Sequence, residues 1–118
     1  MTVAEFFADR EESRHIFDAL RAVMDDFDGV EVQVTKSQIA FRRRVAFAWV
    51  WMPGKYLGGR VAPLVLTLAL RRREASPRWK EVVEPAKGRF THHLELRSVD
   101  EIDDEVRSWL LEAWNAAG

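Results

Sequence analysis

The stretch Val30–Met52, which reads VEVQVTKSQIAFRRRVAFAWVWM, decides the fold class of this chain. Valines alternate with polar residues at its start, which is the period of a strand with one buried face. Ile39 and Phe41 repeat the alternation after Lys36-Ser37, a polar break that suits a tight turn. Residues 45–52 are then apolar at every position, as in a central strand. Strands joined by such short connections predict an antiparallel sheet.

Further strand patterns follow downstream of this stretch. Leucines occupy alternate positions over residues 64–70, a short edge strand is expected over 78–84, and apolar residues alternate again over 90–96. The loop GKYLGGRVAP, residues 54–63, precedes these strands. A phosphate loop would continue from Gly-Lys into Ser or Thr and then a helix. Tyr56 follows Lys55 instead, so we interpret this segment as a hairpin loop.

Helical patterns flank the strands on both sides. Thr2 and Glu5 have the spacing of a capping box, and an apolar stripe with three- and four-residue spacing predicts a helix over 11–27. A second stripe, which includes Trp109, predicts a helix over 100–115. We therefore expect one α+β domain over residues 1–118. In this fold an antiparallel sheet of about five strands carries the N- and C-terminal helices on one face, and the other face is open.

Composition excludes several classes of protein. The 118 residues are 47% hydrophobic and 31% charged, which suits a soluble globular domain, and there is no cysteine to form disulfides or bind metal. No apolar run has the ~18–20 residues of a membrane span, and no signal-peptide pattern starts the chain. We expect a cytoplasmic protein without a membrane association and without a cofactor.

The adjacent histidines His92 and His93 do not indicate a metal site. Neighbouring residues of a strand point to opposite faces, so the two rings cannot easily chelate one ion. No nucleophilic serine lies in a Gly-x-Ser-x-Gly turn either. We therefore predict no metal site and name no catalytic residue, while either histidine on the open face would be able to contact a ligand.

Charge is divided unevenly along the chain. Residues 1–28 carry a net charge of −5, residues 29–97 carry +9 and residues 98–118 carry −5. The middle segment contains two arginine triplets, at 42–44 and 71–73. If the acidic helices cover one face of the sheet, basic groups should dominate the other, where they would attract anions. The alternative interpretation, which we favour from sequence, is that these arginines are simply solvated strand ends.

Tryptophans offer a second possible contact surface. Trp49 and Trp51 have the spacing of one strand face, shared with Phe47, and this face is either core or an aromatic floor on the open side. Core is the expectation that we prefer. Trp79 has few apolar neighbours in sequence, and we expect it to be partly exposed.

Several motifs together resemble a known family. The segments VTKSQIAF, FAWVW, SPRWKEVVEP and RFTHHLELRSVDEIDDEVRSWLLEAW resemble an uncharacterised bacterial family named domain of unknown function fifty-six fifty-five. The features that carry the resemblance are Lys36, Phe41, Phe47, His92-His93, Asp103-Asp104 and Trp109-Leu110. The resemblance implies no activity, cofactor or catalytic residue. It suggests a shape similar to frataxin-like helix–sheet–helix domains, which bind ligands.

The function that we expect is a small binding module rather than an enzyme. Its partner would be an anionic small molecule or an acidic protein, held on a basic sheet face. Two alternatives stay open: a single-stranded nucleic-acid binder, which the acidic helices disfavour by repelling the phosphate backbone, and an enzyme without a recognisable motif. The residues predicted to contact the ligand are Lys36, Arg43, Trp51, Arg71 and His93.

Overall fold

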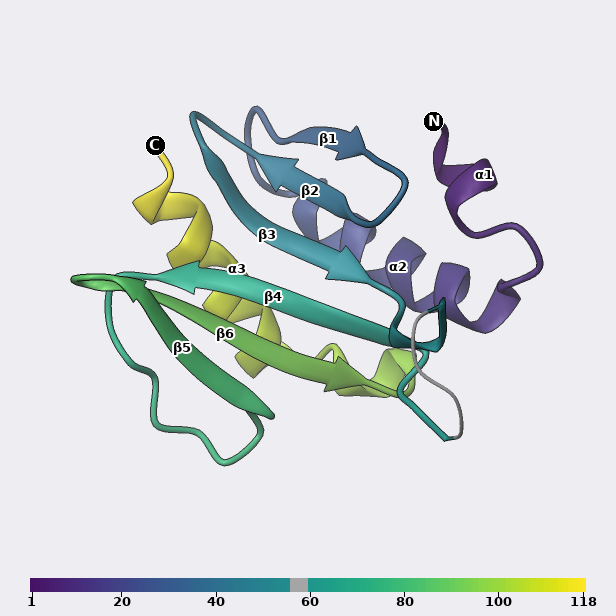
Figure 1. Cartoon of the computed structure of the whole chain (residues 1–118). Helices are drawn as coiled ribbons and strands as arrows, with labels where there is room; N and C mark the ends of the chain where they lie inside the picture. The colour runs from purple at the N-terminus through teal and green to yellow at the C-terminus, as the bar shows by residue number, and fades with distance from the viewer. Residues whose placement is uncertain (56–59) are drawn as a thin grey trace.

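The computed structural model describes residues 1–55 and 60–118, and its centre is an antiparallel sheet (Figure 1). The sheet has six strands in the order β1-β2-β3-β4-β6-β5, one more than the approximate count expected from sequence. Every neighbouring pair is antiparallel, which confirms the predicted fold class. The strands are β1 (Glu31–Val34), β2 (Ile39–Arg42), β3 (Ala46–Trp51), β4 (Leu64–Leu70), β5 (Glu81–Ala86) and β6 (Arg89–Leu96).

The order of the last strands departs from a simple meander. The first four strands follow one another across the sheet, but β6 pairs with β4 and leaves β5 at the edge. Residues 71–80 therefore pass β6 before β5 begins. The edge position suits Pro85, because proline has no N–H to donate to a further strand.

The helices lie together behind the sheet, as predicted (Figure 1). The short helix α1 (Val3–Phe6) begins with the expected capping box of Thr2 and Glu5. Helix α2 (Glu11–Met24) contacts β4, and α3 (Asp104–Ala116) contacts β3 and β4. The second capping box starts the 3₁₀ turn η2 (Val99–Glu101) rather than α3, whose N-cap is Asp103.

Strand alternation separates a core face from an open face. Leu66, Leu68 and Leu94 point toward the helices and are at most 2% exposed. Phe17 and Leu110 from α2 and α3 complete this core from the other side. The residues between them on each strand point to the open face, which no helix of the described residues covers (Figure 1).

A β-bulge changes the face of Phe47. The pairing of β2 with β3 shifts between Phe41 and Arg42, so that Phe41 pairs with Ala48 and Arg42 with Ala46. Phe47 is the extra residue and lies in the core, 1% exposed. Val50 and Leu66 pair with each other and face the helices. Trp49 and Thr67, the pair one residue along, therefore point to the open face. The expectation that Phe47, Trp49 and Trp51 share a core face was therefore wrong.

Trp79 is buried, contrary to the sequence expectation. Its ring lies 4.2 Å from Trp109 and 4.8 Å from His92, measured between ring centroids. Its indole N–H donates to Glu74 Oε1 at 3.0 Å. Trp109 itself is 4% exposed, as predicted from the helical stripe. The apolar neighbours of Trp79 come from distant segments, which is why the local sequence did not reveal them.

The loop after β3 is described only in part. Residues 53–55 form the 3₁₀ turn η1 (Pro53–Lys55), and the chain is described again from Arg60. The predicted glycine-rich loop thus lies partly outside the described residues, since 56–59 are not among them. Among the helices of the described chain, none combines the length and the apolar character that crossing a membrane requires.

Candidate functional site

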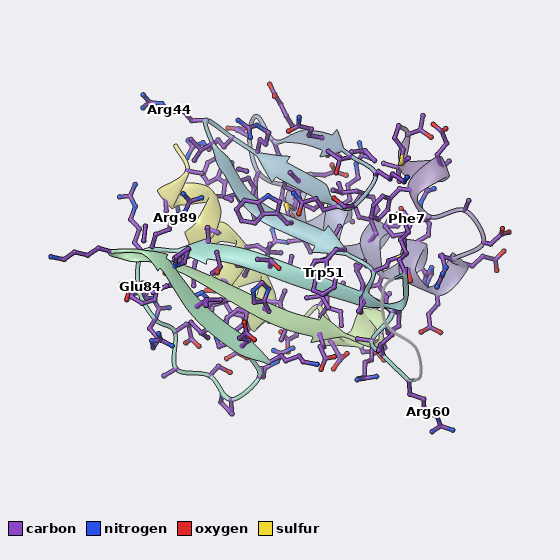
Figure 2. The ribbon with its side chains drawn as sticks, viewed as in Figure 1. Phe7, Arg44, Trp51, Arg60, Glu84 and Arg89 are labelled. Carbon is purple, nitrogen blue, oxygen red and sulfur yellow. The ribbon has the colours of Figure 1, made fainter. Side chains whose placement is uncertain are left out.

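A row of side chains crosses the open face of the sheet. Strand pairing places Ala40 beside Trp49, Trp49 beside Thr67, and Thr67 beside His93. Directly paired residues of antiparallel strands point to the same face. Trp51 lies two residues further along β3 and shares this face, where Figure 2 shows it over the middle of the sheet. Four adjacent strands thus build one aromatic and polar surface.

This surface is hollowed, and we call the depression the aromatic hollow. Its volume is about 510 Å³, which falls in the size range of small-molecule sites. Two hairpins form its sides, because Gln38 belongs to the β1–β2 connection, while Ala86 ends β5 and Arg89 begins β6 on either side of the β5–β6 turn. The lining residues are Gln38, Trp49, Trp51, Thr67, Pro85, Ala86, Arg89, Thr91 and His93.

Thr67 and His93 form a polar pair in the floor of this hollow. Thr67 Oγ1 lies 2.8 Å from His93 Nδ1, and Thr67 is 7% exposed. Either the hydroxyl donates to the ring or the ring N–H donates to the hydroxyl. In both cases the contact fixes the orientation of the imidazole. The second ring nitrogen, Nε2, makes no hydrogen bond with a described residue, so His93 retains a polar atom for a ligand.

A smaller hollow adjoins the first one along Trp51 and His93. Its volume is about 300 Å³, and its other lining residues include Val65, Lys80 and Glu95. Lys80 Nζ lies 3.3 Å from Glu95 Oε2. This side of the open face therefore carries paired charges of both signs and does not select an anion.

The structure brings together only two of the five predicted contact residues, Trp51 and His93. Lys36 is exposed in the turn between β1 and β2. Arg43 Nη1 donates to the carbonyl oxygen of Trp114 at 3.2 Å, and Arg71 Nη2 donates to that of Ala116 at 3.0 Å. Both arginines thus donate to carbonyl groups in the last turn of α3, where the carbonyl of Trp114 also accepts from the backbone N–H of Ala117.

The expected basic sheet face is therefore replaced by a basic sheet end. The β2–β3 turn, the end of β4 and the β5–β6 turn meet at one end of the sheet, where Arg44 and Arg89 are labelled in Figure 2. Cations at this end lie near the negative, C-terminal pole of the α3 dipole and interact favourably with it. The middle of the open face carries tryptophans and the Thr67–His93 pair instead.

Sequence reasoning predicted only Trp51 and His93 of the hollow and missed the other lining residues, among them Thr67, Trp49 and Arg89. Thr67 is the one polar residue in the apolar run Leu64–Leu70, and this was a usable signal. Trp49 was considered but expected in the core. Arg89 gave no signal, because its position beside the hollow depends on the insertion of β6 between β4 and β5.

The two histidines point to opposite faces, as predicted. His92 is fully buried on the helix side, and its Nε2 accepts a hydrogen bond from the backbone N–H of Glu74 at 3.0 Å. Burial lowers the pKa of His92, so the ring is held neutral. No group of three metal-ligating side chains is found among residues 1–55 and 60–118.

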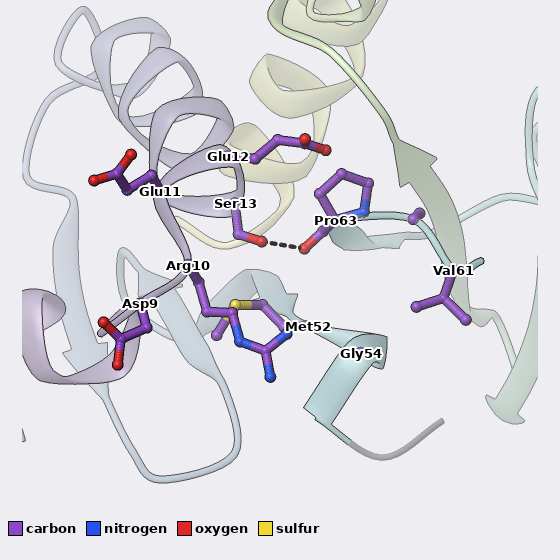
Figure 3. A pocket seen from close by; sticks show the side chains of 10 residues that line it. Asp9, Arg10, Glu11, Glu12, Ser13, Met52, Gly54, Val61 and Pro63 are labelled. Atoms are coloured by element: carbon purple, nitrogen blue, oxygen red, sulfur yellow. Dashed lines mark hydrogen bonds between the residues drawn. The ribbon is translucent and has the colours of Figure 1, made fainter. Parts of the chain in front are cut away.

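A separate hollow of about 560 Å³ lies between the start of α2 and the entry to β4 (Figure 3). Ser13 Oγ donates to the carbonyl oxygen of Pro63 across it, at 2.7 Å. This bond fastens α2 to the chain before β4. The lining includes Gly54 and Val61, on either side of the undescribed residues 56–59, and we place the candidate site on the sheet instead.

Comparison with known proteins gives one match. A family model described as a domain of unknown function, DUF5655, matches residues 3–117. No curated protein and no solved structure matches the chain.

Proposed function

The chain belongs to the DUF5655 family, whose function is unknown, and we propose that it is a small non-enzymatic binding module for a ring-bearing anionic ligand. The ligand occupies the aromatic hollow on the open face of the sheet. The observation that carries this proposal is the convergence of Trp51 and His93 with Trp49 and Thr67 in one hollow.

The tryptophans supply the contact surface for the ring. Trp49 and Trp51 are half-buried, so each presents part of its indole to the hollow. Stacking of aromatic rings contributes about 0.5–1.5 kcal/mol beyond the burial of apolar area. Partly exposed tryptophans beside a polar pair are the composition expected of a ligand site rather than of a solvated surface.

The charge of the lining supports an anionic ligand. Arg89 and His93 line the aromatic hollow, and none of its described lining residues is a carboxylate. Arg89 makes no ion pair with a described residue. Its guanidinium is therefore free to bind an anionic group of a ligand. The acidic residues Glu81 and Glu95 line the adjoining smaller hollow instead.

The polar pair supports binding more than catalysis. A hydroxyl nucleophile requires a base that a third group orients. Thr67 contacts His93 through Nδ1, but no described carboxylate makes a hydrogen bond to that ring. Glu81 lies directly across from His93 in the strand pairing without bonding to it. We therefore assign His93 to ligand contact, oriented by Thr67.

We also propose that the protein acts in the cytoplasm, in keeping with its lack of cysteine. Fractionation of cells that express the full-length protein would test this. Recovery in a secreted or membrane fraction would contradict it.

Titration calorimetry with three classes of probe tests the binding function. The probes are indole-3-acetate, adenosine monophosphate and a short oligothymidylate, each at low and high salt. Wild-type protein should bind at least one small aromatic anion, and Trp51→Ala and His93→Gln should weaken that binding several-fold. His15→Gln, on the exposed side of α2, is the matched control and should bind like wild type.

Two results would contradict the proposal. The first is that no small probe binds, or that Trp51→Ala binds it unchanged. The second is that the oligonucleotide binds far more tightly than the mononucleotide with a steep salt dependence, which would favour the single-stranded nucleic-acid alternative.

A further inference from the structure

A third hollow lies at the basic end of the sheet, and we call it the arginine hollow. Its volume is about 540 Å³. Three arginines line it, together with alanines and other apolar residues, and no carboxylate is among the described lining residues. These residues are Arg42, Val45, Ala46, Phe47, Ala69, Leu70, Arg71, Gly88, Arg89, Ala113, Ala116 and Ala117.

Two of the three arginines have no partner among the described residues. Arg71 donates to the carbonyl oxygen of Ala116 and is already engaged. Arg42 and Arg89 make neither an ion pair nor a side-chain hydrogen bond with any residue in 1–55 or 60–118. Arg42 is half-buried, which makes an unpartnered guanidinium there more costly than on an open surface. An anion would satisfy it.

The strand pairing sets the space between these two arginines. Arg42 ends β2 and Arg89 begins β6, and β3 and β4 lie between them. The β3–β4 pairing reaches only as far as Ala48 and Leu68, so the two strands diverge beyond these residues at this end of the sheet (Figure 1). Ala46, the partner of Arg42, and Ala69, the partner of Thr91, fill the positions between. Together with Ala113, Ala116 and Ala117 of α3, these short side chains leave room at the diverging strand ends, and Arg42 and Arg89 both line it.

The β-bulge of β3 determines which side chains of this strand face the room. It moves Phe47 into the core and brings Ala46 opposite Arg42. Phe47 therefore lines the hollow from the core side, and the small Ala46 takes the position beside Arg42 on the open face. Bulges are common where a strand must re-aim a side chain near a site. The bulge therefore serves both the core and the hollow.

Negative groups nearby are already engaged or lie outside the lining. The last carbonyls of α3 accept hydrogen bonds from Arg43, Arg71 and the backbone N–H of Arg44. Glu84 Oε2 accepts from the backbone N–H of Gly88. Glu31 lies across from Arg42 in the pairing but forms no ion pair with it. Among the arginines that line the hollow, Arg42 and Arg89 thus remain to bind a ligand.

Arg89 lines both the arginine hollow and the aromatic hollow, which makes them neighbours. We infer that the ligand has two joined parts: a planar ring over Trp49 and Trp51, and a phosphate or carboxylate group between Arg42 and Arg89. Guanidinium groups bind both anions with paired N–H donors. This inference rests on the proposed function and adds the position of the anionic group and the length of the ligand.

Matched probes that differ only in charge test the inference. The pairs are adenosine monophosphate with adenosine, and indole-3-acetate with indole-3-acetamide. The charged member of at least one pair should bind about tenfold more tightly than its neutral partner at low salt, equivalent to ~1.4 kcal/mol. The pair that shows the difference distinguishes phosphate from carboxylate.

Arginine variants locate the anionic group. Arg42→Gln and Arg89→Gln should each weaken binding of the charged probe about fivefold to tenfold and leave the neutral probe unchanged. Arg44→Gln is the control, because Arg44 belongs to the same basic end but does not line the arginine hollow. Circular dichroism and thermal melting of each variant check that the fold is intact.

The outcomes separate this inference from the proposed function. If charged and neutral probes bind equally and the arginine variants change nothing, the inference and the anionic character of the ligand are overturned, while binding of a ring in the aromatic hollow stands. If Arg44→Gln weakens binding as much as Arg42→Gln, the anion responds to general charge, which also overturns the inference. If no ring-bearing probe binds, the proposed function itself fails.

Discussion

The guanidinium of Arg43 lies 3.7 Å from the centroid of the Trp114 ring and also donates a hydrogen bond to the carbonyl oxygen of the same residue. The β2–β3 turn is thereby fastened to the last turn of α3. A cation in this position compensates the negative end of the helix dipole. Neighbouring residues of the first arginine triplet thus have different roles. Arg43 contacts the end of α3, whereas Arg42 lines the arginine hollow.

Arg43→Ala should destabilise the fold by about 1–2 kcal/mol, because it removes a cation–π contact and a charged hydrogen bond. Urea unfolding followed by fluorescence measures the change. Arg44→Ala is the control and should stay within about 0.5 kcal/mol, since its side chain is exposed. Equal effects of the two variants would contradict a specific role for Arg43.

Trp109→Ala should cost about 3–5 kcal/mol, because it removes a buried indole and leaves a cavity. This is a large share of the roughly 5–15 kcal/mol by which small domains are stable. Leu111→Ala, at an exposed position of the same helix, should change the free energy of unfolding far less. A loss below ~1 kcal/mol for Trp109→Ala would mean that the indole does not pack as described.

His92 should make stability depend on pH. Burial lowers its pKa in the folded state, so near pH 6 the unfolded chain binds protons more readily than the folded one. Above about pH 6.5, the ordinary histidine value, His92 is neutral in both states and does not lower the free energy of unfolding. As the pH falls from there toward the folded-state pKa, protonation of the unfolded chain lowers the free energy of unfolding.

The free energy of unfolding should accordingly fall between about pH 6.5 and 5, above the range where most carboxyl groups titrate. His92→Gln keeps an acceptor for the Glu74 N–H but removes the titration, so its stability should change less over this range. His15→Gln, at an exposed position of α2, is the control for replacing a histidine. A His92→Gln profile parallel to that of wild type would assign the pH dependence to other groups.

Thr67→Val should release the ring of His93 at a cost in stability of about 1 kcal/mol, the usual contribution of one hydrogen bond. Nitrogen-15 spectra of the imidazole should show a changed balance of its two tautomers. Affinity for an aromatic anion should fall several-fold. Thr91→Val is the control for the spectra only, because Thr91 makes no hydrogen bond with His93 but also lines the aromatic hollow. An unchanged His93 tautomer in Thr67→Val would show that Thr67 does not orient the ring.

Much of the fold followed from local patterns. Alternation located the strands, helical spacing located α2 and α3, and the Thr2–Glu5 spacing identified a capping box that the structure contains. The opposed directions of His92 and His93 also followed, because neighbouring residues of a strand must point to opposite faces. These features depend on the geometry of a few consecutive residues.

The wrong expectations share one physical cause. Alternation shows that Trp49 and Trp51 share a face, but the packing of the helices determines which face is covered. Trp79 is buried by residues about 13 and 30 positions away, His92 and Trp109, which no local pattern reveals. The bulge that separates Phe47 from Trp49 requires the pairing with β2.

The sequence by itself determined the elements, their amphipathic character and the position of both arginine triplets along the chain. Tertiary structure alone decided that Trp51, Thr67, His93 and Arg89 meet, because they lie on three strands whose order is set by the insertion of β6 beside β4. It also decided which arginines are free, since the carbonyl that Arg43 binds is 71 residues away. A local pattern encodes the direction of a side chain, whereas its partners depend on how distant segments pack.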